Sequence, residues 1–267
     1  LNQRRLLHRK HRAAAFCVIT IEDLMKKLRL GEFERNSLVV FAITMIANVL
    51  SYLYQIVMGN VLTPADYGTV NTLLSLSVVV GVPSGIISAL TATYTAKYHA
   101  HGETFAIAAF MHGMLRVAAV LAAIVFVVGA LLSRPIAHVL QIDDPHYVTV
   151  VMVLVASNCL GPVFSSTLQG VKRFIPYSMN SVLSFAFRLL LGVIFVWLGW
   201  GIPGALAALI LAACLTMLYC LFKSRDLFFA PVKEKLALDR TEIRRYFVST
   251  FWFQLFLLLM ANGDVLL

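Results

Sequence analysis

Six apolar stretches of the chain, each long enough to cross a bilayer, constrain the fold more than any other feature. A membrane-spanning helix needs about 20 consecutive apolar residues. The stretches lack the strict alternation of a β-barrel strand, and a backbone in lipid must otherwise satisfy its hydrogen bonds within helices. We therefore predict an all-α, polytopic membrane protein. The predicted spans are residues 37–59, 67–91, 107–132, 147–169, 177–199 and 202–222, and a seventh begins near Tyr246 and continues to Leu267.

Composition supports this prediction. Of the 267 residues, 60% are hydrophobic and 13% are charged, and the mean hydropathy is +0.84. A soluble domain is typically about half apolar and a quarter charged. A water-soluble fold of this length could not bury so much apolar surface, so lipid is the expected solvent.

The net charge of +9 reflects where the basic residues lie rather than a nucleic-acid site. Nine of the 22 Lys and Arg precede residue 36, and seven lie between Lys223 and Arg245. Basic residues concentrate in cytoplasmic loops, and the predicted spans leave 19 on one side against Arg134 on the other. We therefore expect a cytoplasmic N-terminus and no nucleic-acid partner, because no nucleic-acid-binding motif accompanies the charge.

This pattern divides the chain into four expected parts. Residues 1–36 form a basic cytoplasmic segment, and residues 37–222 form a six-helix transmembrane lobe. Residues 223–245 form a basic cytoplasmic linker, and residues 246–267 begin a second lobe. Because residue 1 is Leu and Met25 precedes a basic stretch, we expect residues 1–24 to be either an upstream extension or the tail of a longer chain. A chain that stops inside an apolar helix is expected to be partial.

Motifs of enzymatic chemistry are absent from the sequence. It contains no Walker loop, no His-Glu-x-x-His, no Gly-x-Ser-x-Gly and no paired carboxylates. Its four cysteines have no metal-ligand spacing, and three of them lie in apolar runs where Cys behaves as a small hydrophobe. We therefore expect no enzyme activity, no cofactor and no metal.

Charged residues within the predicted spans are the first candidates for function, because they are costly in lipid. Arg188 lies about twelve residues into the fifth span. It is either a cationic wall for an anionic ligand, or a structural pair or snorkelling side chain. Asp264, in the seventh span, is a candidate for ion coupling, or lies solvated near the interface. Arg116 is a weaker substrate-binding candidate, and snorkelling to the interface is its simpler explanation.

Uncharged polar residues give a weaker signal of a hydrated cavity. Asn48 and Gln55 are seven residues apart, hence on one face of the first helix, and Asn180 adds an amide in the fifth span. We expect these three to bind substrate. Hydrogen bonds between helices, worth about 0.6 kcal/mol each, are an equally ordinary explanation.

The second span contains a break. Gly81, Pro83 and Gly85 interrupt it, and proline removes an internal hydrogen bond of a helix. We expect a hinge at this point, with close helix packing as the alternative.

Several motifs, in their order and spacing, resemble the polysaccharide biosynthesis or oligosaccharide flippase family. The motifs are Asn48 to Gln55, Leu-Thr-Pro-Ala-Asp-Tyr-Gly at 62–68, Leu168 to Phe174, Arg188-Leu, Gly-Ile-Pro-Gly-Ala at 201–205 and Asn-Gly-Asp at 262–264. This family belongs to the multidrug/oligosaccharidyl-lipid/polysaccharide exporter superfamily. The resemblance implies two six-helix lobes that work by alternating access, of which this chain supplies the first and the start of the second.

The resemblance also implies a substrate and partners. The family moves undecaprenyl-diphosphate-linked sugars across a prokaryotic cell membrane, so the expected partners are a lipid-linked glycan, membrane lipids and other polysaccharide-assembly proteins. A drug or cation antiporter of the same superfamily is the first alternative, and the lack of Asp and Glu in the first six spans counts against it. A glycosyltransferase or polymerase subunit and a non-transporting fragment are the others.

Overall fold

Every regular element in the described part of the chain is a helix, as predicted. The computed structural model describes residues 32–142, 144–229, 250–253 and 256. The helices are α2 (Glu32–Val61), α3 (Pro64–Val80), α4 (Val82–Ala100), α5 (Thr104–Leu131), α6 (Ser133–Val139), α7 (Pro145–Gly170), α8 (Phe174–Trp197) and α9 (Gly201–Phe228). Five are long and apolar enough to cross a membrane, or six if the bent pair α3–α4 counts as one span. The chain is therefore a multi-pass membrane protein.

Some predictions fall on residues outside this description. They are the basic N-terminal segment up to residue 31 with Met25, most of the basic linker, and Asp264 with most of the seventh span. Phe251 to Phe253 are helical, which is the described fragment of that span.

Two helices begin at a side-chain cap followed by proline. The Thr63 hydroxyl oxygen accepts a hydrogen bond from the Asp66 backbone N–H at 3.2 Å, and Pro64 opens α3. At α7, a carboxylate oxygen of Asp144 accepts from the His146 N–H at 2.9 Å, and Pro145 occupies the first turn. Such caps satisfy backbone donors that a helix leaves free, and proline has none to satisfy there.

The second predicted span is bent as well as interrupted. α3 and α4 meet at 48°, with Gly81 between them and Pro83 in the first turn of α4. The prediction of a break at these residues is confirmed, but the predicted end at residue 91 is wrong. α4 continues to Ala100, because Tyr94 and Thr95 remain buried against the lobe. The short helix α6 was also not predicted.

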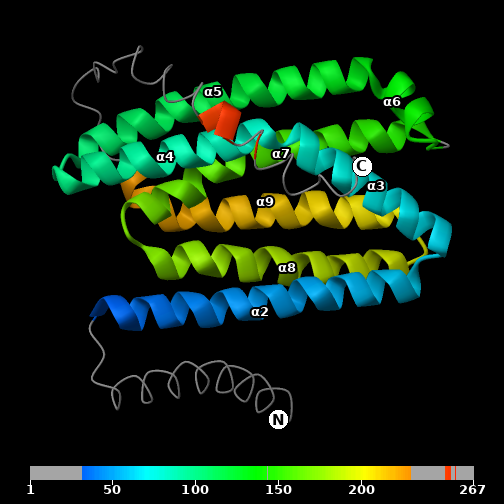
Figure 1. Ribbon diagram of the computed structural model, residues 1–267, viewed down its shortest axis with the longest axis horizontal. Coiled ribbons are helices and arrows are strands. Elements are labelled where there is room, and N and C mark those ends of the chain that lie inside the picture. The colour runs from blue at the N-terminus through cyan, green and yellow to red at the C-terminus, as the bar shows by residue number, and fades with distance from the viewer. Residues whose placement is uncertain (1–31, 143, 230–249, 254–255, 257–267) are drawn as a thin grey trace, which may run out of the picture.

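Helix α7 lies at the centre of the lobe. It packs against α4 and α5 on one side and α9 on the other, and it also contacts α3, α6 and α8. α8 packs on α9, and α2 packs on α8 at the edge of the lobe (Figure 1). Residues of α7 therefore reach both the cluster around Phe110 and the cluster around Leu209, which form the core.

α4 and α7 approach each other closely at Gly170. A Cβ atom at this glycine would lie 2.7 Å from the Cβ of Thr95 and 2.9 Å from the carbonyl oxygen of Ala92. About one turn away along α7, the hydroxyls of Ser88 and Ser166 are hydrogen-bonded at 2.7 Å. Small residues at such contacts let helices in a membrane approach closely.

We predict that Gly170→Ala destabilises the lobe, because the new methyl group overlaps backbone and side-chain atoms of α4. Overpacking of this kind typically costs about 1–3 kcal/mol. Thermal unfolding of the detergent-purified protein measures the effect. Gly113→Ala is the matched control, since open space surrounds its Cβ position, and equal melting temperatures for the two variants would contradict the prediction.

Candidate functional site

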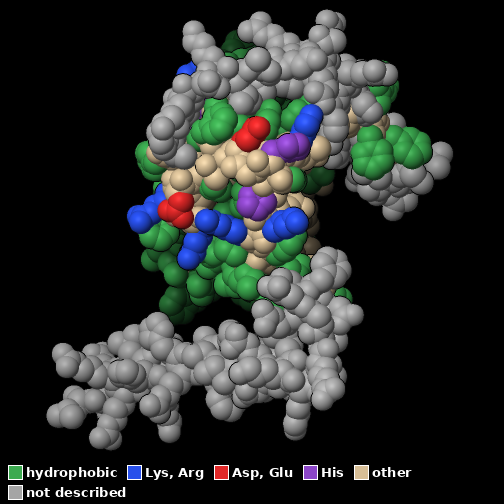
Figure 2. All heavy atoms as spheres, turned by 90° about the vertical axis from the view of Figure 1, so that its left-hand side faces the viewer, with side chains coloured by type: hydrophobic (Ala, Val, Ile, Leu, Met, Phe, Trp, Pro, Cys, Tyr) green, Lys and Arg blue, Asp and Glu red, His purple; other side chains and the backbone are tan. Residues whose placement is uncertain are grey.

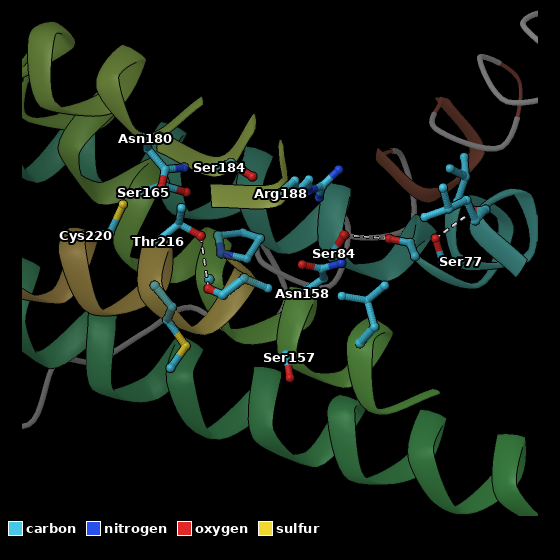
Figure 3. A pocket seen from close by; sticks show the side chains of 18 residues that line it. Ser77, Ser84, Ser157, Asn158, Ser165, Asn180, Ser184, Arg188, Thr216 and Cys220 are labelled. Carbon is cyan, nitrogen blue, oxygen red and sulfur yellow. Dashed lines mark hydrogen bonds between the residues drawn. The ribbon is translucent and has the colours of Figure 1, made fainter. Parts of the chain in front are cut away.

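A cavity of about 570 Å³ opens between α3, α4, α7, α8 and α9 (Figure 3). Its walls combine apolar side chains with hydroxyl, amide and guanidinium groups. The lining residues are Leu74, Ser77, Val78, Gly81, Ser84, Leu154, Ser157, Asn158, Gly161, Pro162, Ser165, Asn180, Ser184, Arg188, Ala213, Thr216, Met217 and Cys220. No acidic side chain is among these residues, so the charge of the described wall is positive.

α8 supplies a polar row to this cavity. Asn180, Ser184 and Arg188 are spaced four residues apart and therefore follow one another along one face of the helix, as Figure 3 shows. α7 contributes Asn158 and Ser165 from its own cavity-lining face. Two amides and a guanidinium thus line a single volume, although they lie on two helices.

Most of the remaining hydroxyls are already used as donors. Ser77 donates to the carbonyl of Leu74 at 2.6 Å, and Ser84 donates to the carbonyl of Gly81 at 2.6 Å. The hydroxyls of Ser157 and Thr216 donate to carbonyls of their own helices at 2.9 Å. Because a hydroxyl has one hydrogen and two lone pairs, these groups offer acceptors to the cavity rather than donors.

Arg188 differs from these hydroxyls in its hydrogen bonding. Its Nε is buried and has no hydrogen-bond partner among the described residues, and its guanidinium lies 5.6 Å from the centre of the Phe185 ring. No Asp or Glu lines the cavity with it. A buried cation without a carboxylate is unfavourable in a protein interior, so the side chain is available to an anion that enters the cavity.

The position of Arg188 depends on the contact between α2 and α8. Gly192, one turn further along α8, packs against Met58 and Tyr54 of α2 with no space for a Cβ. The Tyr54 hydroxyl is also buried without a hydrogen-bond partner in the described part, and the phenol interacts electrostatically with Arg188. Tyr54 is not among the residues that line the cavity.

The structure brings some of the predicted site residues together and separates others. Arg188 and Asn180 line the cavity, and Gly81 lines it at the α3–α4 break, with Pro83 and Gly85 beside it. Three further candidates are exposed and do not line it: Asn48 and Gln55 on α2, and Arg116 on α5. Asp264 lies outside the described residues.

Sequence reasoning missed several lining groups, among them Ser77, Ser84, Thr216 and the proline inside α7, Pro162. Ser77 and Ser84 lie on opposite sides of the α3–α4 break, and their seven-residue spacing was a usable signal. Serines in apolar helices are common, however, and hydropathy gives them little weight.

Comparison with known proteins identifies the family. The chain belongs to the polysaccharide biosynthesis protein family, whose model matches residues 33–267. No curated protein matches the chain in sequence. Solved structures that share the fold are described as transporters.

Solved structures show the same fold. A MOP superfamily transporter from Pyrococcus furiosus, described as having a binding pocket of reverse polarity, is 16% identical with a TM-score of 0.61; the match covers 84% of this chain and 53% of that one. The Vibrio cholerae MATE transporter in its bent form is 17% identical, with a TM-score of 0.66 and coverage of 87% and 57%. This chain therefore spans about half the length of the transporters it matches.

We predict that Arg188→Met raises the thermal stability of the protein, because an unpaired guanidinium is removed from the interior of a membrane lobe. Insertion scales place the cost of a central Arg at about 2.5–3.5 kcal/mol, and a part of this should be recovered. Melting temperatures in detergent measure it. Arg134→Met, at an exposed position of α6, should change little; a lower melting temperature for Arg188→Met would show that the guanidinium stabilises the lobe.

Proposed function

We propose that this chain is the N-terminal lobe of a flippase that moves an undecaprenyl-diphosphate-linked oligosaccharide across a prokaryotic cell membrane. The product would supply a cell-surface polysaccharide such as lipopolysaccharide, and transport would proceed by alternating access. The observation that carries the proposal is Arg188, a guanidinium in a cavity whose described wall contains no carboxylate. Membership of the polysaccharide biosynthesis family supports a glycan-related substrate.

The donors of the cavity fit a diphosphate. Hydrogen bonds from ionised donors to phosphate oxygens are roughly twice as strong as neutral ones, and a guanidinium can bind two oxygens at once. Arg188 would hold the phosphates, and the amides of Asn158 and Asn180 can each donate further N–H groups. The four hydroxyls whose hydrogens are directed to backbone carbonyls would accept hydrogen bonds from sugar hydroxyls; they are those of Ser77, Ser84, Ser157 and Thr216.

The size of the cavity limits what this lobe would hold. Small-molecule sites typically occupy about 300–1,000 Å³, and this cavity is about 570 Å³. It suits a diphosphate with the sugar next to it rather than a whole oligosaccharide. The rest of the glycan would extend beyond this lobe, and the prenyl chain would stay in lipid.

The other predicted site residues take part in the proposal in different ways. Gly81 lies between Ser77 and Ser84 on the cavity wall, so a change in the α3–α4 bend would move these two hydroxyls relative to each other. Asn48, Gln55 and Arg116 are exposed, and we propose that they meet substrate only outside this cavity. Ion coupling by Asp264 remains part of the proposal.

A drug or cation antiporter is the alternative function, because the MATE transporters share this fold. A cationic substrate needs an acidic partner, and the described cavity wall presents a guanidinium instead. The cavity therefore favours an anionic substrate.

We also propose that the end of the lobe where α2 begins faces the cytoplasm. Lys97, Lys172, Arg173, Lys223 and Arg225 lie at this end, at helix termini or in turns, whereas the opposite end has only Arg134 among the described Lys and Arg. Figure 2 views the basic end and shows Lys and Arg side chains gathered on it. This asymmetry is typical of cytoplasmic loops.

The substrate proposal predicts that Arg188→Ala in the full-length protein weakens binding of undecaprenyl diphosphate about ten- to hundredfold, since hydrogen bonds to charged groups contribute about 1.5–3 kcal/mol. Binding to the purified protein, and surface glycan in a flippase-deficient bacterium that supplies the lipid-linked glycan, are the two measurements. Arg134→Ala is the matched control. Unchanged affinity in the Arg188 variant would exclude the cationic cavity as the diphosphate site.

The topology proposal predicts which engineered cysteines are accessible from outside the cell. A membrane-impermeant thiol reagent applied to intact cells should label Arg134→Cys, because α6 would lie at the outer surface, and should leave Lys172→Cys unlabelled until the cells are opened. The background is a variant in which the native cysteines are replaced by serine or alanine. Reversed labelling would show that the lobe has the opposite orientation.

A further inference from the structure

A second hollow lies outside the cavity, on the opposite side of the packed pair of helices α8 and α9. It is an apolar groove of about 820 Å³, lined by Met179, Leu183 and Phe187 of α8 and by apolar residues of α9. Two of the latter, Leu218 and Phe222, are 54% and 62% exposed, so the groove is open at the surface. It shares no lining residue with the cavity that contains Arg188.

The groove has a length comparable with the thickness of one leaflet of the membrane. From Met179 to Phe187 it follows α8 for about 12 Å, at a rise of about 1.5 Å per residue. One leaflet of the hydrocarbon core is about 15 Å thick, half of the total of about 30 Å. The groove therefore runs from the basic end of the lobe towards the middle of the membrane.

A positively charged residue, Arg225, lies at the end of the groove that is nearest to the basic end of the lobe. Arg225 is the charged residue among those that line it, and its guanidinium lies 5.2 Å from the centre of the Phe222 ring. Such a contact holds the charge beside the apolar wall. Arg225 is 62% exposed, so an anion can still reach it.

The charge around Arg225 is not cancelled. Asp226 lies 3.7 Å from Arg225 and also 3.7 Å from Arg173, so a single carboxylate is shared by two guanidinium groups. Arg173 in addition donates to the backbone carbonyl of Lys223 at 3.1 Å, which joins the α7–α8 turn to the end of α9. The groove therefore ends at a surface with an excess of positive charge.

We propose that this groove is a binding site for a membrane phospholipid with an anionic headgroup. One acyl chain would lie along the groove, and the headgroup phosphate would meet Arg225. Basic pockets between transmembrane helices bind anionic headgroups in this way. The inference does not rest on the proposed function, because it uses neither Arg188 nor any substrate of the cavity.

Two other occupants fit the groove less well: the chain segment that follows α9, and the prenyl chain of a substrate. The segment that follows α9, residues 230–249, contains five basic and three acidic residues, so it is a poor match for a cationic groove. The prenyl chain of a substrate whose diphosphate is bound at Arg188 would have to pass between α8 and α9, which pack against each other.

Lipid retention tests the proposal. The intact protein is purified into mixed micelles with equal amounts of phosphatidylglycerol and phosphatidylcholine, and the retained lipids are measured by native mass spectrometry. We expect phosphatidylglycerol to be enriched in the wild type and its enrichment to fall about fivefold in Arg225→Gln, which is the effect of one basic residue near an anionic surface. Arg225→Lys should keep most of it, and Arg134→Gln, at the other end of the lobe, should keep all of it.

A second variant tests the groove itself without changing charge. Leu218→Trp should fill the groove and reduce retention of both phospholipids, while size-exclusion chromatography shows that each variant is folded. Three results would each overturn the proposal: the same enrichment in Arg225→Gln as in the wild type, unchanged lipid retention in Leu218→Trp, or displacement of phosphatidylglycerol by an equal amount of undecaprenyl phosphate. The last result would assign the groove to a prenyl chain.

Discussion

The absence of water from the hydrocarbon core determines how polar groups in this lobe are arranged. Each backbone N–H and C=O in lipid needs a partner within the protein, and helices provide it along most of the described chain. Where the helical pattern is interrupted, at Gly81, the neighbouring side chains take over. Ser84 donates to the carbonyl of Gly81 through its hydroxyl as well as its backbone N–H, and both the break and this hydroxyl lie at the wall of a cavity. Irregular backbone at membrane depth is therefore tolerated because a cavity, and not lipid, borders it.

Arg188 differs from these groups, because its buried Nε has no hydrogen-bond partner among the described residues. Its charge also has no carboxylate in the described cavity wall, so we expect the guanidinium to lower the stability of the lobe. Proteins retain residues of this kind where function requires them. The close contact of Gly192 with Met58 and Tyr54 fixes α2 against α8 and thereby fixes the helix that carries the guanidinium. The packing of α2 on α8 is thus linked to the position of the Arg188 charge.

The sequence predicted the membrane class, the six spans, the break at Gly81 and the place of Arg188 inside a long apolar helix, because hydropathy and proline act locally. It did not predict the extension of α4 to Ala100, since burial of Tyr94 and Thr95 depends on α7. Periodicity placed Asn48 and Gln55 on one face of α2 but could not say what that face meets. Arg116 is similar: the buried face of α5 contains Met111, Met114 and Ala118, and Arg116 points elsewhere.

The pairing of α8 with α9 has a mechanical consequence. The two helices are joined by a short turn in which Gly199 and Gly201 adopt positive φ angles of 83° and 52°, and they line the polar cavity on one side and the apolar groove on the other. A shift of one helix against the other must therefore reshape both hollows together. By thermodynamic reciprocity, an occupant of either hollow that favours one helix separation alters affinity at the other by the same factor. The composition of the surrounding bilayer would then alter how tightly the lobe binds the substrate proposed for the cavity.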